Sequence, residues 1–137
     1  MRIFFDTSAF AKRYVREAGS DAVLALCDQA AELCLAAIAI PELVSAFCRL
    51  HRDGHLTPQQ YTALKTGLFR DIVDIAICDL SPTVIHQTVM GLEQNRLRAM
   101  DAIHIGCAVA LQVDTFVTAD ARQCDAARQA GLTVIYV

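Results

Sequence analysis

Four acidic residues stand where short apolar runs give way to helical segments. Asp6 ends "RIFFD" at residues 2–6, Glu42 lies in "AIPELV" after a second run, and Asp120 follows "DTFVT" in "FVTADAR". Asp101 begins "DAIHIGCAVAL", which is apolar on almost every side and is therefore typical of a buried helix. Because a carboxylate at the edge of an interior segment is costly unless something pairs with it, these acids are candidates for a shared site.

Acids of this kind indicate metal chemistry. Four carboxylates held close together repel one another and resist ionising together, and a divalent cation removes that penalty. Oxygen ligands favour Mg²⁺ or Mn²⁺ over zinc, and no cysteine or histidine pair in the chain has the spacing of a zinc site. A metal held in this way activates water and stabilises charge on phosphoryl oxygens, so the residue types predict phosphodiester hydrolysis.

Each acid also has a purely structural explanation. Asp101 is compatible with an N-cap role, which is worth about 0.5–2 kcal/mol to a helix. Glu42 and Asp120 are compatible with first-turn positions that the helix dipole favours. Asp6 has a helix to cap only if one starts immediately after its strand. Four caps on one edge remain an alternative to a functional cluster, although a less economical one.

The elements that must position these acids alternate along the chain. Runs typical of strands occur at residues 2–6, 33–38, 74–80, 114–118 and 132–137, with helical segments between them. Because the runs are apolar on both faces, they predict a parallel sheet covered by helices on each side. We expect a three-layer α/β/α sandwich with about five mainly parallel strands, formed by a single domain over residues 1–137. In such a sheet the ligand site lies beyond the carboxyl ends of the strands, where the acids fall.

Helix boundaries are marked by residues with clear local roles. Thr57 precedes Pro58 and stands three residues before Gln60, which is the pattern of a capping box. Ser81 before a proline repeats the device, so the neighbouring Asp79 is placed outside the site. Gly54 and Gly131 are expected to end helices.

Composition excludes several classes of protein. The net charge of −3 gives no strong basic field for nucleic acid, although a ligand held through bound metal remains possible. No run approaches the roughly eighteen apolar residues of a membrane span, and the N-terminus does not have the form of a signal peptide. The six cysteines contain no C-x-x-C pair, and free, reduced thiols are expected. We therefore expect a cytoplasmic protein.

Four stretches together resemble the motifs of the PIN-domain family. They are "FFDTSAFAKRYVREAGS", "AIPELVSAF", "RLRAMDAIHIGCAVAL" and "FVTADARQCDAARQAGLTVI", in this order along the chain. The chain is most similar to small bacterial PIN proteins of the VapC type, which are the toxins of toxin–antitoxin pairs. The resemblance covers essentially the whole chain, and "MDAIH" followed by "TAD" is its most specific part.

This resemblance implies a metal-dependent ribonuclease that cuts RNA. It implies that Mg²⁺ or Mn²⁺ is bound by four acids, namely Asp6, Glu42, Asp101 and Asp120. It also implies that hydroxyl groups support these ligands by hydrogen bonds, at Thr7, Ser8 and Thr118. The implied partners are an RNA substrate, a VapB-like antitoxin that also binds DNA, and a second copy of the chain in a homodimer. A PIN ribonuclease that acts without an antitoxin is the nearest alternative.

Other residues admit two interpretations. His104 lies one turn after Asp101 and could approach a metal, but a histidine on an apolar helix is more often a hydrogen-bonded core residue. Lys12 and Arg98 are close in sequence to the acids, and we select them as possible contacts to RNA phosphates. Solvated helix faces explain Arg13 and Arg16 equally well.

Two other classes of protein are also considered. A signalling receiver domain would use Asp79 as its phospho-acceptor, but the chain has no lysine near its C-terminus and only one acid at the end of the first strand. A non-catalytic interaction module with a vestigial site is the second, although the four acids are intact.

Overall fold

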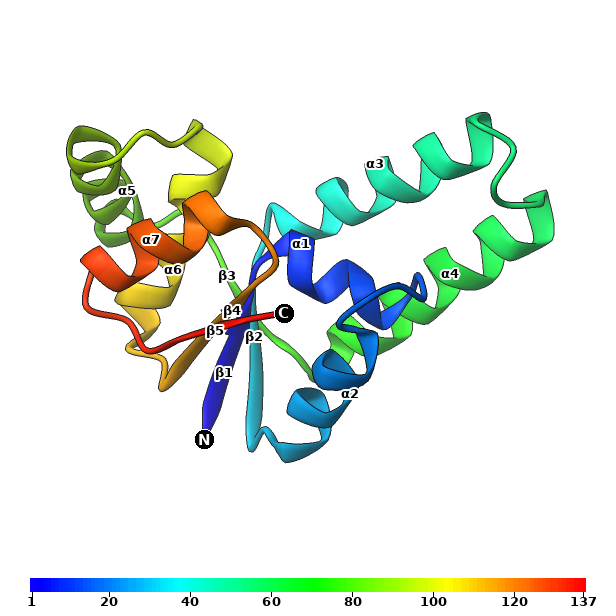
Figure 1. Ribbon diagram of the computed structural model, residues 1–137, viewed down its shortest axis with the longest axis horizontal. Helices are drawn as coiled ribbons and strands as arrows, with labels where there is room; N and C mark the ends of the chain where they lie inside the picture. Colours follow the sequence, from blue (N-terminus) through cyan, green and yellow to red (C-terminus); the bar gives the residue numbers. More distant parts are fainter.

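A parallel sheet of five strands lies at the centre of the computed structural model, which describes all 137 residues (Figure 1). The strands are β1 (Arg2–Phe5), β2 (Glu32–Ala36), β3 (Ala76–Cys78), β4 (Thr115–Thr118) and β5 (Val134–Tyr136). Their order across the sheet is β3-β2-β1-β4-β5, and every neighbouring pair is parallel. The five predicted strands are confirmed, each within a few residues of its expected position.

Helices cover both faces of the sheet. They are α1 (Thr7–Phe10), α2 (Ser20–Gln29), α3 (Ala39–Arg52), α4 (Pro58–Asp71), α5 (Pro82–Gln94), α6 (Ala99–Leu111) and α7 (Ala121–Gln129), with 3₁₀ turns at Ala11–Arg13 and Ile72–Asp74. Figure 1 shows α3 and α4 as a pair of helices that projects from the body as an arm. The predicted three-layer α/β/α architecture is confirmed.

Two apolar cores explain why the strands are hydrophobic on both faces. Ile3 and Phe5 point to one face, where they pack in a buried cluster with side chains from α1 to α4. Phe4 points to the other face, and its cluster contains side chains of α5, α6 and α7. Successive side chains of a strand alternate between faces, so a central strand needs apolar residues at every position.

Local signals set several helix ends as predicted. Thr57 and Gln60 form a reciprocal capping box at the start of α4, and the Ser81 hydroxyl accepts a hydrogen bond from the Val84 amide at the start of α5. Gly54 and Gly131 follow α3 and α7 with φ angles of 81° and 87°. This left-handed backbone suits glycine, which has no Cβ.

The strand order identifies the edge where a ligand is expected. The chain leaves β1 to build one side of the sheet through β2 and β3, whereas β4 and β5 extend the other side. The carboxyl ends of β1 and β4 therefore form a topological switch point, the usual position of a site in open α/β sheets. Receiver domains have the order 2-1-3-4-5, so the receiver interpretation does not fit this sheet. None of the helices is long and apolar enough to cross a membrane.

Candidate active site

Asp6 lies fully buried at the end of β1. Its carboxylate accepts hydrogen bonds from the Ala9 amide at 2.9 Å, from the Ser8 hydroxyl at 2.7 Å and from the Thr118 hydroxyl. The bond from Ala9 makes Asp6 the N-cap of α1, so a helix does start immediately after the strand. Burial raises the pKa of Asp6 above its ordinary value even though these hydrogen bonds act in the opposite direction.

Hydroxyl groups join the ends of β1 and β4. The Thr118 hydroxyl, which donates to Asp6, accepts a hydrogen bond from the Asp120 amide at 3.0 Å. The Ser8 hydroxyl likewise accepts from the Ala119 amide at 3.0 Å. Asp6 and Asp120 are thus held in one network, although 114 residues separate them in sequence.

Asp120 is an N-cap, whereas Asp101 is not. The Asp120 carboxylate accepts a hydrogen bond from the Arg122 amide at 2.9 Å and caps α7. Asp101 is the third residue of α6, and the N-cap position belongs to Arg98. The structural explanation of Asp101 as an N-cap is therefore wrong, although its position in the first turn of α6 is one that the helix dipole favours for an acid.

The surroundings of Asp101 disfavour its ionised form. Burial is the largest cause that raises the pKa of Asp101, and the negative charges of Asp120 and Glu42 raise it further. Those two neighbours show that the fold brings acids from α3, α6 and α7 into electrostatic contact. The Gln123 amide donates one hydrogen bond, at 3.2 Å, to the Asp101 carboxylate.

Glu42 lies in the first turn of α3 and is held from two other elements. The Thr7 hydroxyl donates to Oε1 of Glu42 at 2.7 Å, and Nε2 of His104 lies 2.7 Å from the same oxygen. Burial acts to raise the pKa of Glu42, but the hydrogen bonds from His104 and Thr7 outweigh it, so the pKa is lowered. His104 is buried, as expected of a core residue, and it is also a direct neighbour of a candidate ligand.

Sequence reasoning missed Gln123. This side chain is 3% exposed, and its Oε1 is buried without a hydrogen-bond partner while its Nε2 contacts Asp101. A polar residue on the buried face of α7, beside Cys124, Ala126 and Ala127, was the available signal. The contact between His104 and Glu42 had no such signal, because 62 residues separate the two in sequence.

The two candidate phosphate contacts, Lys12 and Arg98, and the excluded acid Asp79 differ in their exposure and in their partners. The Lys12 ammonium donates to the Ala18 carbonyl at 2.5 Å and lies 3.7 Å from Glu17, with 11% of its side chain exposed. Arg98 is exposed and forms no ion pair. Asp79 is exposed beyond β3, one of the two edge strands of the sheet, and forms no side-chain hydrogen bond with the four acids.

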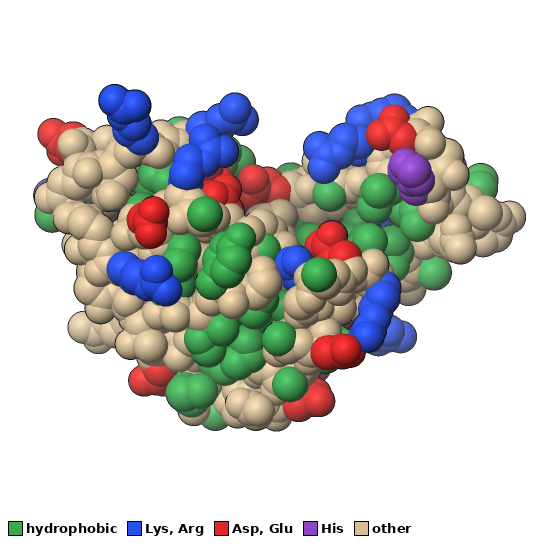
Figure 2. All heavy atoms as spheres, in the orientation of Figure 1, with side chains coloured by type: hydrophobic (Ala, Val, Ile, Leu, Met, Phe, Trp, Pro, Cys, Tyr) green, Lys and Arg blue, Asp and Glu red, His purple; other side chains and the backbone are tan.

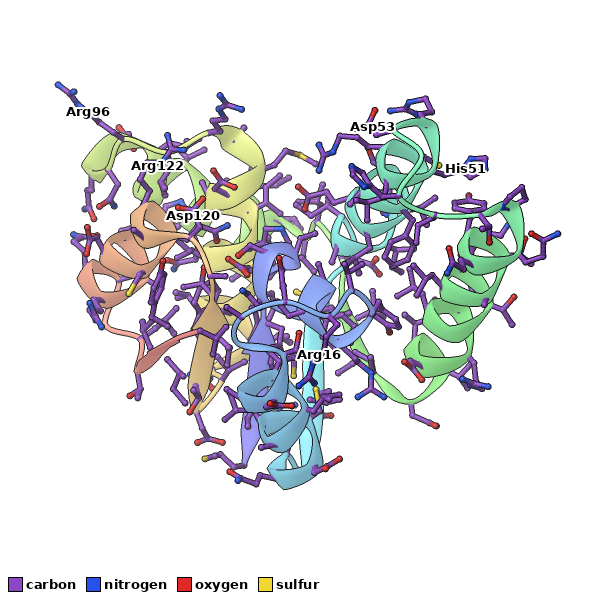
Figure 3. All side chains as sticks on the ribbon, turned by 45° about the vertical axis from the view of Figure 1, so that its right-hand side comes forward. Arg16, His51, Asp53, Arg96, Asp120 and Arg122 are labelled. Carbon is purple, nitrogen blue, oxygen red and sulfur yellow. The ribbon has the colours of Figure 1, made fainter.

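A hollow separates the two halves of the molecule above the sheet edge. Figure 2 shows acidic side chains at its floor and Lys or Arg side chains on both rims. In Figure 3, Asp120 and Arg122 lie at the start of α7, and His51 and Asp53 mark the far end of α3 on the arm. Arg16 lies below this hollow, where it pairs with Asp21.

Asp101 interacts electrostatically with Glu42 and Asp120, and Thr118 links Asp6 to Asp120 by hydrogen bonds, but the four acids do not surround a single point. No three His, Cys, Asp or Glu side chains are arranged to hold one ion in their present conformations. Glu42, Asp101 and Asp120 each accept protein hydrogen bonds through a single carboxylate oxygen, and both oxygens of Asp6 accept hydrogen bonds. Three acids therefore keep one oxygen for a ligand.

Comparisons with known proteins agree with this fold. The family model of the PIN domain matches residues 3–129, and no curated protein matches the chain. FitAcB from Neisseria gonorrhoeae superposes with a TM-score of 0.72 at 19% identity, covering 97% of this chain and 96% of the other. VapC20 from Mycobacterium tuberculosis, a sarcin-ricin loop cleaving toxin, gives 0.69 at 14% identity over 98% and 99%. VapBC-5 from the same organism, a member of the VapBC family of toxin-antitoxin systems, gives 0.66 at 12% identity over 99% and 98%. The chain belongs to the PIN-domain family.

Proposed function

We propose that this chain is a Mg²⁺- or Mn²⁺-dependent endoribonuclease, formed by a single PIN-like domain over residues 1–137. The observation that carries the proposal is the electrostatic proximity of Asp101 to Glu42 and Asp120, together with the hydrogen bonds through Thr118 that link Asp120 to Asp6. Membership of the PIN family supports a nuclease, and the similarity to VapC20, a sarcin-ricin loop cleaving toxin, supports cleavage of RNA.

The chemistry of the acid cluster fits a hard divalent cation. All candidate donors are carboxylate oxygens, the kind of ligand that Mg²⁺ and Mn²⁺ prefer. The pKa of Asp101 is raised by burial and then by neighbouring negative charges, which outweigh the opposing effects of His104 and Arg122. We therefore propose that Asp6, Glu42, Asp101 and Asp120 would hold the ion. When bound, the ion supplies a Lewis acid that activates water and stabilises the phosphoryl oxygens.

The protein's own groups prepare this site. The hydroxyls of Ser8 and Thr118 hold the Asp6 carboxylate between two strand ends, and Thr7 holds Glu42. Such supporting hydrogen bonds fix the orientation of ligands before the ion arrives. Asp6 itself is fully buried.

We also propose that the chain is a toxin controlled by a VapB-like antitoxin and that it forms a homodimer. VapBC-5 belongs to a family of toxin-antitoxin systems, which supports an antitoxin. Ile85, Val89 and Leu92 are exposed at helical spacing along α5, and an exposed apolar stripe of this kind supports pairing with another copy. A PIN ribonuclease without an antitoxin is distinguished by the absence of growth arrest when the chain is expressed alone.

The test incubates the purified protein with mixed RNAs in Mg²⁺, in Mn²⁺ or in EDTA. We expect cleavage only with metal, and Asp101→Asn is expected to reduce it by more than about 100-fold, because even residues that merely support ligands cost about 10- to 100-fold. Mn²⁺ is expected to raise the melting temperature of the unmutated protein but not of Asp101→Asn. Cleavage in EDTA, or full activity of Asp101→Asn, contradicts the proposal.

A further inference from the structure

The exposed face of α3 has a positively charged side chain two helical turns beyond Glu42. Arg49 follows Glu42 by seven residues, which is two turns of helix and about 10.5 Å of rise. A seven-residue separation turns the side chain by only about 20° around the axis, so both residues lie on the same side of α3. Leu43 and Phe47 occupy the opposite, buried side.

Arg49 has no acidic partner. It is exposed and forms no ion pair, unlike Arg13, Arg16 and Arg122, whose guanidinium groups lie within 4.0 Å of an aspartate. Arg52 lies three residues further along the arm and is likewise exposed and unpaired. Long cationic side chains without partners are available for an anionic ligand.

The opposite rim carries a matching charge. Arg98 occupies the N-cap position of α6, three residues before Asp101, and its exposed side chain makes neither a capping bond nor an ion pair. Arg49 and Arg98 therefore lie on different elements, each of which also contributes one acid to the cluster. Figure 2 shows Lys or Arg side chains on both sides of the acidic floor.

This distribution of charge matches a strand with several phosphates better than a ligand with one. The chain has a net charge of −3, so its overall field does not attract a polyanion. Cations on the rims instead provide local contacts to the phosphates on either side of the scissile phosphate, which lies at the acids. Such contacts position a nucleic acid without reading its bases. An acidic peptide would also contact the rims, but it would bring no phosphate to a metal at the floor.

We propose that a single RNA strand crosses the hollow and that Arg49 and Arg98 hold the phosphates on the two sides of the scissile one. This inference rests on the proposed ribonuclease function and adds the path of its substrate. The path runs from the arm, along the exposed side of α3, over the acids to the loop before α6. The Lys12 ammonium, which is occupied by Ala18 and Glu17, does not take part.

The test replaces Arg49 and Arg98 individually by glutamine. The matched control is Arg70→Gln, because Arg70 is also exposed and unpaired at a helix end. Unlike the two rim arginines, Arg70 lies beside Leu33 and Asp71, near the amino end of β2 and not near the acids at the carboxyl ends of the strands. On an oligoribonucleotide of about ten nucleotides we expect KM to rise roughly three- to tenfold for each rim variant, with kcat nearly unchanged. The slope of log affinity against log salt is expected to fall by about 0.7 for each arginine.

A dinucleotide separates phosphate contacts from structural damage. It contains only the scissile phosphate, so the rim variants are expected to cleave it like the unmutated protein, whereas a misfolded site would lose both substrates. Equal KM values for Arg49→Gln and Arg70→Gln on the long strand, or equal losses on the dinucleotide, overturn the inference.

Binding of a labelled oligoribonucleotide to the Asp101→Asn protein gives a measurement independent of cleavage. If the unmutated protein cuts no RNA but Arg49→Gln still weakens this binding, the proposed function fails while the strand path stands. If an acidic peptide of equal charge displaces the oligonucleotide equally well at the same concentration, the rims form a protein-docking surface and the inference is wrong.

Discussion

Nε2 of His104 lies 2.7 Å from Oε1 of Glu42, so the buried helix α6 contacts the first turn of α3 through two polar groups. Nδ1 of His104 is buried and has no partner. The arrangement is satisfied by the tautomer with its proton on Nε2, because a proton on Nδ1 would be buried without an acceptor. His104 therefore acts on the site by orienting a carboxylate.

His104→Leu is expected to reduce metal-dependent cleavage by about 10- to 100-fold, which is the usual cost of losing a group that supports a ligand. Loss of the hydrogen bond also removes a cause that lowers the pKa of Glu42. His104→Gln is the matched variant, because its amide keeps a donor at a similar position. Cleavage rates of both variants check the prediction, and it is contradicted if leucine has no effect or if glutamine restores nothing.

Asp101→Asn is expected to stabilise the metal-free protein at neutral pH. The pKa of Asp101 lies above its ordinary value of 3.8, first because of burial and then because of the charge of Asp120. As the pH rises, Asp101 ionises in the unfolded chain before it ionises in the folded protein, and this difference destabilises the folded protein. The destabilising effect is absent below pH 3.8 and reaches its full size above the raised pKa.

Urea unfolding in EDTA across this range measures the effect. The stability difference between Asp101→Asn and the unmutated protein is expected to grow with pH and then to level off. Ser81→Ala is the control, because Ser81 is the N-cap of α5 and loss of a true N-cap costs about 1 kcal/mol. A decrease in stability for Asp101→Asn at every pH would mean that the residue has a structural role.

Gly106→Ala is expected to destabilise the protein by about 1–3 kcal/mol through overpacking. A Cβ at this position would lie 2.5 Å from the Thr88 hydroxyl oxygen and 3.0 Å from the Val84 carbonyl oxygen, because α5 packs closely on α6 there. Gly91→Ala provides the opposite case: nothing lies within 4 Å of its Cβ, and alanine in a helix interior gains about 0.5–1 kcal/mol over glycine. Denaturant midpoints distinguish the two, and equal effects would show that the helices can separate.

Much of the fold could be predicted because its signals are local or periodic. The capping box of Thr57 and Gln60 involves residues three apart, so sequence spacing alone predicts the start of α4. Strands that are apolar on both faces indicate a parallel sheet, and parallel strands place their carboxyl ends on one edge. The common position of Asp6, Glu42 and Asp120 follows from that rule before any contact is known.

Contacts between distant segments could not be predicted in the same way. Whether Asp101 caps α6 depends on where that helix begins, and the structure places the N-cap at Arg98. Lys12 is close to Asp6 in sequence, but the loop that contains Ala18 folds back, and the Ala18 carbonyl accepts a hydrogen bond from the Lys12 ammonium. The partners of His104 and Gln123 depend on how three helices pack, which no local pattern specifies.

The sequence by itself determined the layers, the strands and the presence of acids on one edge, because these follow from hydrophobic periodicity and from the geometry of parallel strands. The tertiary structure alone decided which acids are caps, which side chains hold them and which arginines remain free to meet a ligand. Those properties depend on distances between segments far apart in the chain, and such distances exist only once the helices have packed on the sheet.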